Sequence, residues 1–273
     1  MSGEAVGKKQ YDAEQFWADR YRDIDLTKSG HIDLPVAYNR WLYRRKKERL
    51  LEGLRAAGFQ AKGSSVLEIA TGTGVYVEMW KGLGVSRLAG IDISQNATDH
   101  LKARFPEFSF HKRDLSAPEL TGLVGKDFDL VTAVDMLYHV VDDAAFAVAL
   151  DNLAQAVKPG GLLAIHDLFL RHGQREFGYI KWRSLNGYIA SLEKAGFEVL
   201  SRTPTFFLTV QAYDFDSPEN ARRMANLWDR FTYPLIGRLP NLMGALGYVS
   251  DRMLGAMLKE GPSFEMMICR RRR

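Results

Sequence analysis

The sequence predicts an α/β fold with a doubly wound parallel sheet, because short apolar runs alternate with helical stretches from about residue 64 to residue 209. Two glycine-containing junctions agree with this alternation. Lys158–Gly161 combines lysine, proline and two glycines, which is typical of the end of a helix and the start of the next strand. Ala195–Phe197 places a glycine at a similar junction further along the chain.

The expected strands are short runs rich in β-branched and other apolar residues. In chain order they are Ser65–Ala70, Ser86–Asp92, Phe108–Lys112, Phe128–Val134, Leu162–Asp167 and Glu198–Arg202. Helices are expected between them, at Gly74–Leu83, Gln95–Phe105, Asp143–Val157 and Arg183–Ala195.

Two segments stand outside this alternation and have a helical pattern. We expect residues 1–62 to form an N-terminal helical lid, 63–212 the core, 213–262 a helical cap inserted before the last strand, and 263–273 that strand with a basic tail. Asp216–Glu219 is a good helix start within the cap. A second amphipathic helix follows, with apolar residues recurring every three or four positions from Leu242 to Met257.

Composition and charge indicate a globular intracellular protein. The chain has 273 residues, of which 46% are hydrophobic, and its net charge of +4 equals the contribution of Arg270–Arg273 alone. The single cysteine, Cys269, fits a reducing cytoplasm. The first fifteen residues have no apolar segment typical of a signal peptide. The longest uncharged stretch, Leu239–Ser250, is far shorter than the roughly 20 residues of a membrane span.

The run Arg40–Arg49 is basic and is interrupted by Trp41, Leu42 and Tyr43. Charge runs of this kind usually form a solvated helix face with an apolar back. We therefore expect the charges of this run to lie in water.

The segment Val66–Tyr76 predicts a ligand-binding turn. An apolar strand ends in Gly72-Thr73-Gly74 and a helix follows, so that a ligand can approach the backbone and the free N–H groups of the helix. A dinucleotide loop would carry a third glycine where this chain has Val77. A nucleoside without phosphates fits this loop better.

Two carboxylates follow the next two strands. Asp92 ends the second strand, where a carboxylate can accept hydrogen bonds from both ribose hydroxyls. Asp114 closes the third strand and can accept from an exocyclic amine such as that of adenine. An aspartate at a strand end also caps turns, and this alternative remains open for Asp114.

These motifs together resemble the core of class I S-adenosylmethionine-dependent methyltransferases of the small-molecule type. The likeness extends over residues 64–205 and continues through Phe128–Val131, Met136–Val140 and Leu192–Val199. It implies a doubly wound, seven-stranded Rossmann-like methyltransferase sheet, with S-adenosylmethionine as cofactor. The cofactor-binding residues that it implies are Glu68, Ala70, Gly72, Gly74, Asp92, Ile93, Asp114, Leu115 and Asp135.

Transfer of a methyl group to a hydroxyl also requires removal of a proton, and histidine suits this task. His139 follows the fourth strand and His166 lies at the end of the fifth, so both are candidate bases, although either can be held by local hydrogen bonds instead. An ordinary histidine predicts an activity limb near pH 6–7. No metal site is expected, since Leu168 follows Asp167 where magnesium-dependent catechol-type enzymes carry asparagine.

The missing proline motif after the fourth strand and the aromatic residues of the lid and cap indicate which kind of acceptor is methylated. Val134–Leu137 contains no proline, unlike the Asn/Asp-Pro-Pro-aromatic segment of enzymes that methylate nucleic-acid bases, so no nucleic-acid partner is expected. Aromatic side chains of the lid and cap predict a closed pocket for a small molecule, although such rings more often form ordinary core. The rings assigned to this substrate pocket are Tyr21, Tyr38, Tyr138 and Trp182.

The sequence thus favours an enzyme that methylates a small molecule, on oxygen before nitrogen, sulfur or carbon, in a secondary-metabolite or glycan pathway. We expect it to act as a monomer or homodimer without a transmembrane segment, with peripheral membrane contact allowed. The competing hypothesis is a non-catalytic protein of the same fold that binds anionic lipid or RNA through Arg40–Arg49 and Arg270–Arg273.

Overall fold

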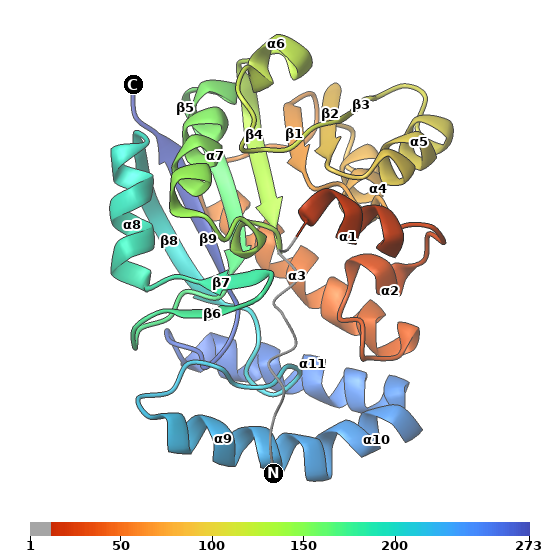
Figure 1. Cartoon of the computed structure of the whole chain (residues 1–273), viewed down its shortest axis with the longest axis vertical. Coiled ribbons are helices and arrows are strands. Elements are labelled where there is room, and N and C mark those ends of the chain that lie inside the picture. Colours follow the sequence, from red (N-terminus) through yellow and green to blue (C-terminus); the bar gives the residue numbers. More distant parts are fainter. Residues whose placement is uncertain (1–11) are drawn as a thin grey trace.

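The computed structural model describes residues 12–273, apart from the side chains of residues 26, 27 and 218. The first eleven residues of the expected lid lie outside the described residues. They include most of the stretch in which the sequence analysis expects no signal peptide. A seven-stranded mixed sheet forms the centre of the molecule, in the order β3-β2-β1-β4-β5-β9-β8 (Figure 1). The α/β fold with a seven-stranded doubly wound sheet is therefore confirmed.

The strands of the large sheet are β1 (Ser65–Ile69), β2 (Arg87–Asp92), β3 (Ser109–Lys112), β4 (Phe128–Val134), β5 (Val157–Asp167), β8 (Phe197–Pro204) and β9 (Glu265–Arg271). Five of them pair in parallel, while β9 lies between β5 and β8 and is antiparallel to both. A separate hairpin consists of β6 (Arg175–Phe177) and β7 (Ile180–Trp182).

Helices cover both faces of the sheet and its carboxyl edge. They are α1 (Ala13–Arg20), α2 (Leu26–Ser29), α3 (Val36–Ala56), α4 (Val75–Gly82), α5 (Gln95–Arg104), α6 (Leu120–Val124), α7 (Asp143–Ala156), α8 (Leu185–Lys194), α9 (Pro218–Leu227), α10 (Tyr233–Arg238) and α11 (Pro240–Met257). A 3₁₀ turn spans Leu137–His139, and a π-helical turn, Trp228–Thr232, joins α9 to α10.

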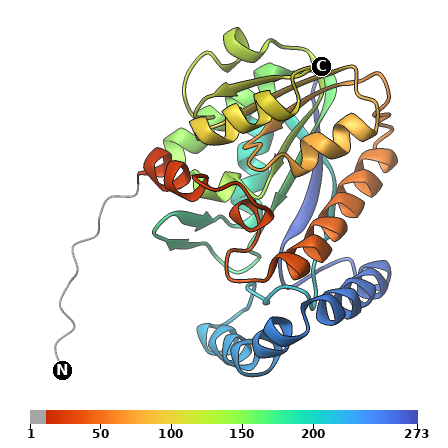
Figure 2. The same ribbon diagram turned by 90° about the vertical axis from the view of Figure 1, so that its right-hand side faces the viewer.

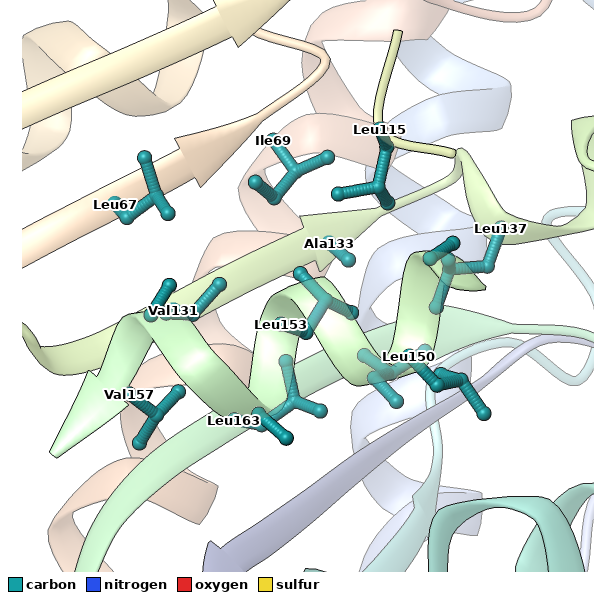
Figure 3. Packing of buried hydrophobic residues seen from close by; sticks show 14 of the residues in the cluster. Leu67, Ile69, Leu115, Val131, Ala133, Leu137, Leu150, Leu153, Val157 and Leu163 are labelled. Carbon is teal, nitrogen blue, oxygen red and sulfur yellow. The ribbon is translucent and has the colours of Figure 1, made fainter. Parts of the chain in front are cut away.

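The alternation of side chains along β1 explains the two-sided core. Leu67 and Ile69 face α7 and α8, where they pack with Val131, Leu153 and other apolar residues (Figure 3). Val66 faces the other way, toward α3, α4 and α5. Since successive strand residues point to opposite faces, the near-continuous apolar runs of the sequence are those of strands buried on both sides.

The largest differences from the predicted strand bounds lie at the start of β5 and at the end of the chain. β5 begins at Val157, before the Lys158–Gly161 turn signal, and the chain bulges there before it pairs again with β4 at Leu162. The basic tail expected at the end of the chain is partly a strand, because Arg270 and Arg271 belong to β9. Their guanidinium groups donate to the carbonyls of Ala57 and Val157, respectively.

The cap helices α9, α10 and α11 form a layer at one end of the molecule (Figures 1 and 2). α9 begins as expected, with Ser217 Oγ accepting from the backbone N–H of Asn220 at 3.2 Å. α11 packs along α3, and no described helix is long and apolar enough to cross a membrane. The division of the chain into lid, core, cap and last strand stays a prediction.

The close approach of α11 to α3 yields a prediction about stability. A Cβ on Gly244 would lie 2.3 Å from the Trp41 ring, whereas a Cβ on Gly237 of α10 meets nothing within 4 Å. Gly244→Ala is therefore expected to lower the free energy of unfolding by about 1–3 kcal/mol. Gly237→Ala, the matched control, should raise it by up to about 1 kcal/mol through helix propensity. Urea unfolding that shows the same change for both variants would contradict this packing.

Candidate functional site

A cavity of about 270 Å³, here called cavity 1, opens at the carboxyl ends of the central strands. Ala70 follows β1, Asp92 ends β2 and Asp135 follows β4, and all three line this cavity. Ala70 and Asp135 have φ values of 54° and 55°, a region that residues other than glycine seldom adopt. Such strain is held by the surrounding structure and is common where parallel sheets bind ligands.

The Asp92 carboxylate is buried in the wall of cavity 1. Its Oδ2 accepts from the backbone N–H of Gly72 at 2.8 Å, and its Oδ1 accepts from that of Ser94 at 2.9 Å. Burial raises the pKa of Asp92 to about 6, against the opposing effect of these hydrogen bonds. The backbone N–H of Ile93 also favours the ionised carboxylate. A carboxylate has about four acceptor positions, so Asp92 can still receive a hydrogen bond from a ligand hydroxyl.

The lid closes on the glycine turn. Ser29 Oγ lies 3.0 Å from Tyr21 Oη and accepts from the backbone N–H of Thr73 at 2.9 Å. A Cβ on Gly72 would lie only 2.3 Å from Ser29 Oγ, so this contact requires glycine at position 72. Gly74 instead faces the core, where a Cβ would lie 2.5 Å from Leu101. Neither glycine lines cavity 1, and Gly74 allows the turn to pack closely against Leu101.

A second cavity of about 470 Å³, cavity 2, adjoins the first. Trp17, Ser29, Asp135 and His139 line both, so the two spaces meet at these four residues. The walls of cavity 2 come mainly from the lid, the β6–β7 hairpin and the cap, and they combine many aromatic rings with charged side chains such as Arg20, Asp33 and Asp229. Its rings include Phe16, Trp17, Tyr138, Tyr179, Trp182, Tyr213, Trp228, Tyr233 and Phe264.

His139 stands at the junction of the two cavities, between the rings of Trp17 and Tyr179. Its Nδ1 lies 3.0 Å from the backbone carbonyl oxygen of Tyr179. Because a carbonyl only accepts, Nδ1 carries the proton and the neutral ring keeps a lone pair on Nε2. Burial lowers the pKa of His139 to about 4, although Tyr179 and Asp135 oppose this shift. The ring is therefore a neutral acceptor over the physiological pH range.

Asp135 is held by a buried polar network from two directions. Its Oδ2 accepts from Lys46 Nζ of α3, and its Oδ1 accepts from Nδ1 of His166 on β5. Burial acts to raise the pKa of Asp135, but the Lys46 ammonium and His166 hold it below its ordinary value. Burial lowers the pKa of His166, so its neutral ring donates to the carboxylate.

His166 lies outside both cavities. Its ring is fully buried, stacks on Phe264 with 5.6 Å between ring centroids, and meets the edge of Phe206. Its Nε2 has no hydrogen-bond partner among the described residues. Of the two candidate bases, only His139 thus borders space that a ligand can enter.

Several buried polar atoms that line the cavities also lack a partner within the described part of the chain. In cavity 1 these are the hydroxyls of Thr71, Thr73 and Tyr76 and the Nε of Arg113, and in cavity 2 they are His31 Nδ1 and Trp182 Nε1. Buried polar groups are nearly always hydrogen-bonded in native proteins. These atoms are therefore expected to find partners beyond the described residues, in water or in a bound ligand.

The other residues assigned to the cofactor lie in two places. Ile93, Asp114 and Leu115 line cavity 1. Asp114 Oδ1 also accepts from the backbone N–H and the hydroxyl of Ser116, each at 2.8 Å, so the turn-capping alternative is part of its role. Glu68 lies below the cavity, where it accepts from Trp80 Nε1 at 3.0 Å and from the Thr132 hydroxyl. Burial raises the pKa of Glu68 to about 7.

The four rings assigned to the substrate are also divided. Tyr21 lines cavity 1, whereas Tyr138 and Trp182 line cavity 2. Tyr38 lies in the core between α3 and the cap, where its hydroxyl donates to the carbonyl of Thr209 at 2.8 Å. The roles assigned to all of these residues stay predictions.

The prediction that the charges of Arg40–Arg49 lie in water holds for Arg40 and Arg44, which are exposed, and is wrong for the rest of the run. Arg45 and Lys46 are buried, and Arg45 donates to the carbonyls of Thr205 at 3.2 Å and Asp251 at 3.1 Å. Arg49 donates to the carbonyl of Pro204 at 3.0 Å. These side chains join α3 to the cap, because buried cations need hydrogen-bond acceptors. Half of the basic residues on which the competing hypothesis of lipid or RNA binding depends are therefore engaged internally.

Ser29, Lys46 and Tyr179 are among the site residues that the sequence analysis does not identify. Lys46 carried one usable signal: it lies three residues after Tyr43 and four before Leu50, which are both buried, so the period of α3 places it on the inner face.

Comparisons with known proteins agree on the kind of domain. The sequence profile of the methyltransferase domain matches residues 38–202. The chain is 34% identical over 101 residues to the ubiquinone biosynthesis O-methyltransferase of Thiobacillus denitrificans, a match that covers 36% of this chain and 42% of the relative. It is 33% identical over 128 residues to the tRNA U34 carboxymethyltransferase of Dichelobacter nodosus, covering 47% of this chain and 39% of the relative. The matches thus span about two fifths of these relatives.

A solved structure shows the same fold over a longer stretch. An S-adenosylmethionine-dependent methyltransferase from Clostridium acetobutylicum superposes with a TM-score of 0.55 and covers 85% of this chain and 92% of its own. The two sequences are 10% identical, so this likeness concerns the fold alone.

The network around Asp135 yields a second prediction. Lys46→Met leaves the buried carboxylate without its cation, so the free energy of unfolding should fall by about 3–5 kcal/mol. Adding Asp135→Asn removes the uncompensated charge and should recover part of this loss in urea unfolding. Lys47→Met, one position along the same helix and outside the network, is the matched control. Equal stability of the Lys46 and Lys47 variants would show that the network contributes nothing to folding.

Proposed function

The chain belongs to the methyltransferase-domain family, and we propose that it transfers the methyl group of S-adenosylmethionine to a hydroxyl oxygen of a small molecule. The observation that supports this proposal is the meeting of two cavities at His139 and Asp135. One cavity offers the buried Asp92 carboxylate and the hydroxyls of Thr71 and Thr73 to a nucleoside, and the other offers aromatic side chains to an acceptor. The junction provides a neutral imidazole where a hydroxyl proton must leave.

The residues of cavity 1 fit the cofactor. We assign the ribose hydroxyls to the Asp92 carboxylate, and the polar groups of the amino-acid part to the unpartnered hydroxyls of Thr71 and Thr73. The adenine falls to the wall formed by Ile93, Asp114 and Leu115. When bound, the cofactor supplies a methyl group on a positively charged sulfur, which an aligned nucleophile displaces in line. Trp17 and Tyr21 also line this cavity, and we expect their rings to exclude water from it.

Cavity 2 selects the acceptor. Its aromatic walls favour a flat, largely apolar molecule, and stacking against Trp182 or Tyr213 fixes the orientation of a ring. The unpartnered nitrogens of His31 and Trp182 provide polar contacts at its edge. We therefore infer a phenolic acceptor class, and relatives named as ubiquinone biosynthesis O-methyltransferases support oxygen as the accepting atom. The proposal that this acceptor belongs to a secondary-metabolite or glycan pathway rests on the sequence resemblance.

His139 takes the proton in this proposal. Its Nδ1–H is engaged by the carbonyl of Tyr179, so Nε2 faces the acceptor as a base. The imidazolium that forms gains stability from the Asp135 carboxylate nearby. Asp135 is in turn kept ionised by Lys46 and His166, which act as positioning residues.

Cofactor affinity should depend on the ionisation of Asp92. The pKa of about 6 means that the carboxylate is protonated below pH 6 in the free protein, while ribose hydroxyls bind the ionised form better. Affinity for S-adenosylmethionine should thus be constant above pH 6 and fall by up to about tenfold per pH unit below it. Calorimetry between pH 5 and 8 tests this expectation. Asp92→Asn should bind about tenfold or more weakly with a flat profile, and a slope that persists in this variant would exclude Asp92 as its origin.

Turnover should depend on His139 rather than on exposed histidines. Acceptors are first found by incubating the protein with methyl-labelled cofactor and a panel of phenols, followed by mass spectrometry. At saturating cofactor, His139→Ala should lower turnover by about 10²–10⁴-fold with cofactor affinity unchanged. His111→Ala, on β3, is the matched control.

The pH profile distinguishes this base from an ordinary one. Because the pKa of His139 is about 4, the base is neutral above that value, and turnover should be flat from pH 6 to pH 9. The activity limb expected near pH 6–7 from an unperturbed histidine thus moves to about pH 4. If His139→Ala kept full activity on every acceptor, catalysis by a histidine base would be excluded. The enzyme would then act by aligning the acceptor with the methyl group of the cofactor.

A further inference from the structure

The helix α11 exposes an unbroken apolar stripe to solvent. Its side chains recur every three or four residues, and each is between 53% and 78% exposed. The members of this outer stripe are Leu242, Leu246, Val249, Met253 and Met257. Single exposed apolar residues are normal on protein surfaces, but a continuous row of five marks an interaction site.

The outer stripe lies opposite the side by which α11 is attached. The attached side consists of Gly244, Tyr248, Asp251 and Gly255. It meets α3, since the Gly244 backbone lies against Trp41 and the Asp251 carbonyl accepts from Arg45 at 3.1 Å. At about 100° per residue, the centres of the two sides are roughly 170° apart around the helix. The outer stripe therefore points directly away from the body of the protein.

The rest of the cap layer is apolar on its surface as well. Large apolar side chains are at least 41% exposed along α9, the π-helical turn, α10 and the start of α11. They are Met224, Leu227, Phe231, Leu235 and Leu239. These helices form one layer with α11 at the end of the molecule (Figures 1 and 2).

Positive charge surrounds this apolar surface. The exposed basic side chains of residues 219–259 are Arg222, Arg223, Arg230, Arg238, Arg252 and Lys259. Within the same stretch only Glu219 and Asp229 are exposed acidic residues, because Asp251 is buried. Exposed apolar side chains with flanking arginines are the composition of helices that lie in a membrane interface.

We propose that the cap layer of α9–α11 docks on an anionic lipid bilayer, with the outer stripe among the acyl chains and the arginines at the headgroups. Aliphatic and methionine side chains gain from leaving water, and each arginine near the surface gains from the negative potential of anionic lipids. A second copy of the chain is a poorer occupant, because a symmetric dimer would bring the same cationic rim against itself. The docking surface is separate from the site, so it stands whether or not the proposed function does.

Co-sedimentation with vesicles tests the proposal. The full chain should bind vesicles of phosphatidylcholine and phosphatidylglycerol, bind pure phosphatidylcholine much less, and lose affinity as salt is raised. Leu246→Ser with Met253→Ser should lower the partition coefficient about tenfold or more. Arg222→Glu with Arg223→Glu should do the same for anionic vesicles.

Each double variant has a matched control elsewhere on the surface. Leu123→Ser with Val148→Ser alters exposed apolar residues of α6 and α7, and α6 lies at the far end of the molecule from the cap (Figure 1). Lys126→Glu with Lys194→Glu changes charge by the same amount. Both controls should bind vesicles as the unaltered protein does, and thermal melts should show that all four variants are folded.

A label reports insertion directly. Cys269 is buried, so Met253→Cys can be labelled selectively with a polarity-sensitive fluorophore. Its emission should shift to the blue with anionic vesicles, while a label at Leu123→Cys should not respond. The proposal is wrong if the unaltered protein ignores anionic vesicles or if the outer-stripe variant binds them equally well. Self-association that the same variant abolishes would assign the face to a second copy instead.

Discussion

The buried contact between Lys46, Asp135 and His166 joins three elements that are far apart in the sequence. It connects α3 to the carboxyl ends of β4 and β5, and the backbone N–H of Asp135 also donates to the carbonyl of His166 at 3.0 Å. Removing these groups from water is costly, so the arrangement is stable only with every partner in place. Because Asp135 borders both cavities, the same contact fixes the wall at which they meet.

The position of the lid and cap follows from how α3 is held. One side of this helix carries Lys46 toward the site, and Arg45 and Arg49 extend to the carbonyls of Thr205 and Pro204. The cap is thereby joined to the helix that supports the site. A displacement of α3 would therefore also displace walls of cavity 2, since α1 and α2 directly precede this helix and α11 of the cap packs on it.

The bounds of β1 to β4 could be predicted to within one residue, because a strand buried on both faces needs an apolar run of that length and little else. β1 and β4 are examples, and Asp92 follows at the end of β2 as expected. The start of β5 could not be predicted, because Lys158–Gly161 has the composition of a turn although the strand already pairs with β4 at Val157. The β6–β7 hairpin could not be predicted, because its strands have three residues each and carry charges. The role of Lys46 escaped for another reason: its partner lies 89 residues away, and periodicity within a helix does not reveal a partner on another element.

Helical periodicity also shows which residues share a face without showing which face is buried. In α11 the apolar residues share the outer side, while glycines at 244, 247 and 255 allow the inner side to approach Trp41, Thr209 and the arginines of α3. Close packing by small residues thus replaces the apolar contact that normally holds an amphipathic helix. The cap layer also supplies Trp228, Asp229 and Tyr233 to cavity 2. If both proposals hold, an acceptor dissolved in the bilayer reaches the protein at the same layer that lines its binding cavity.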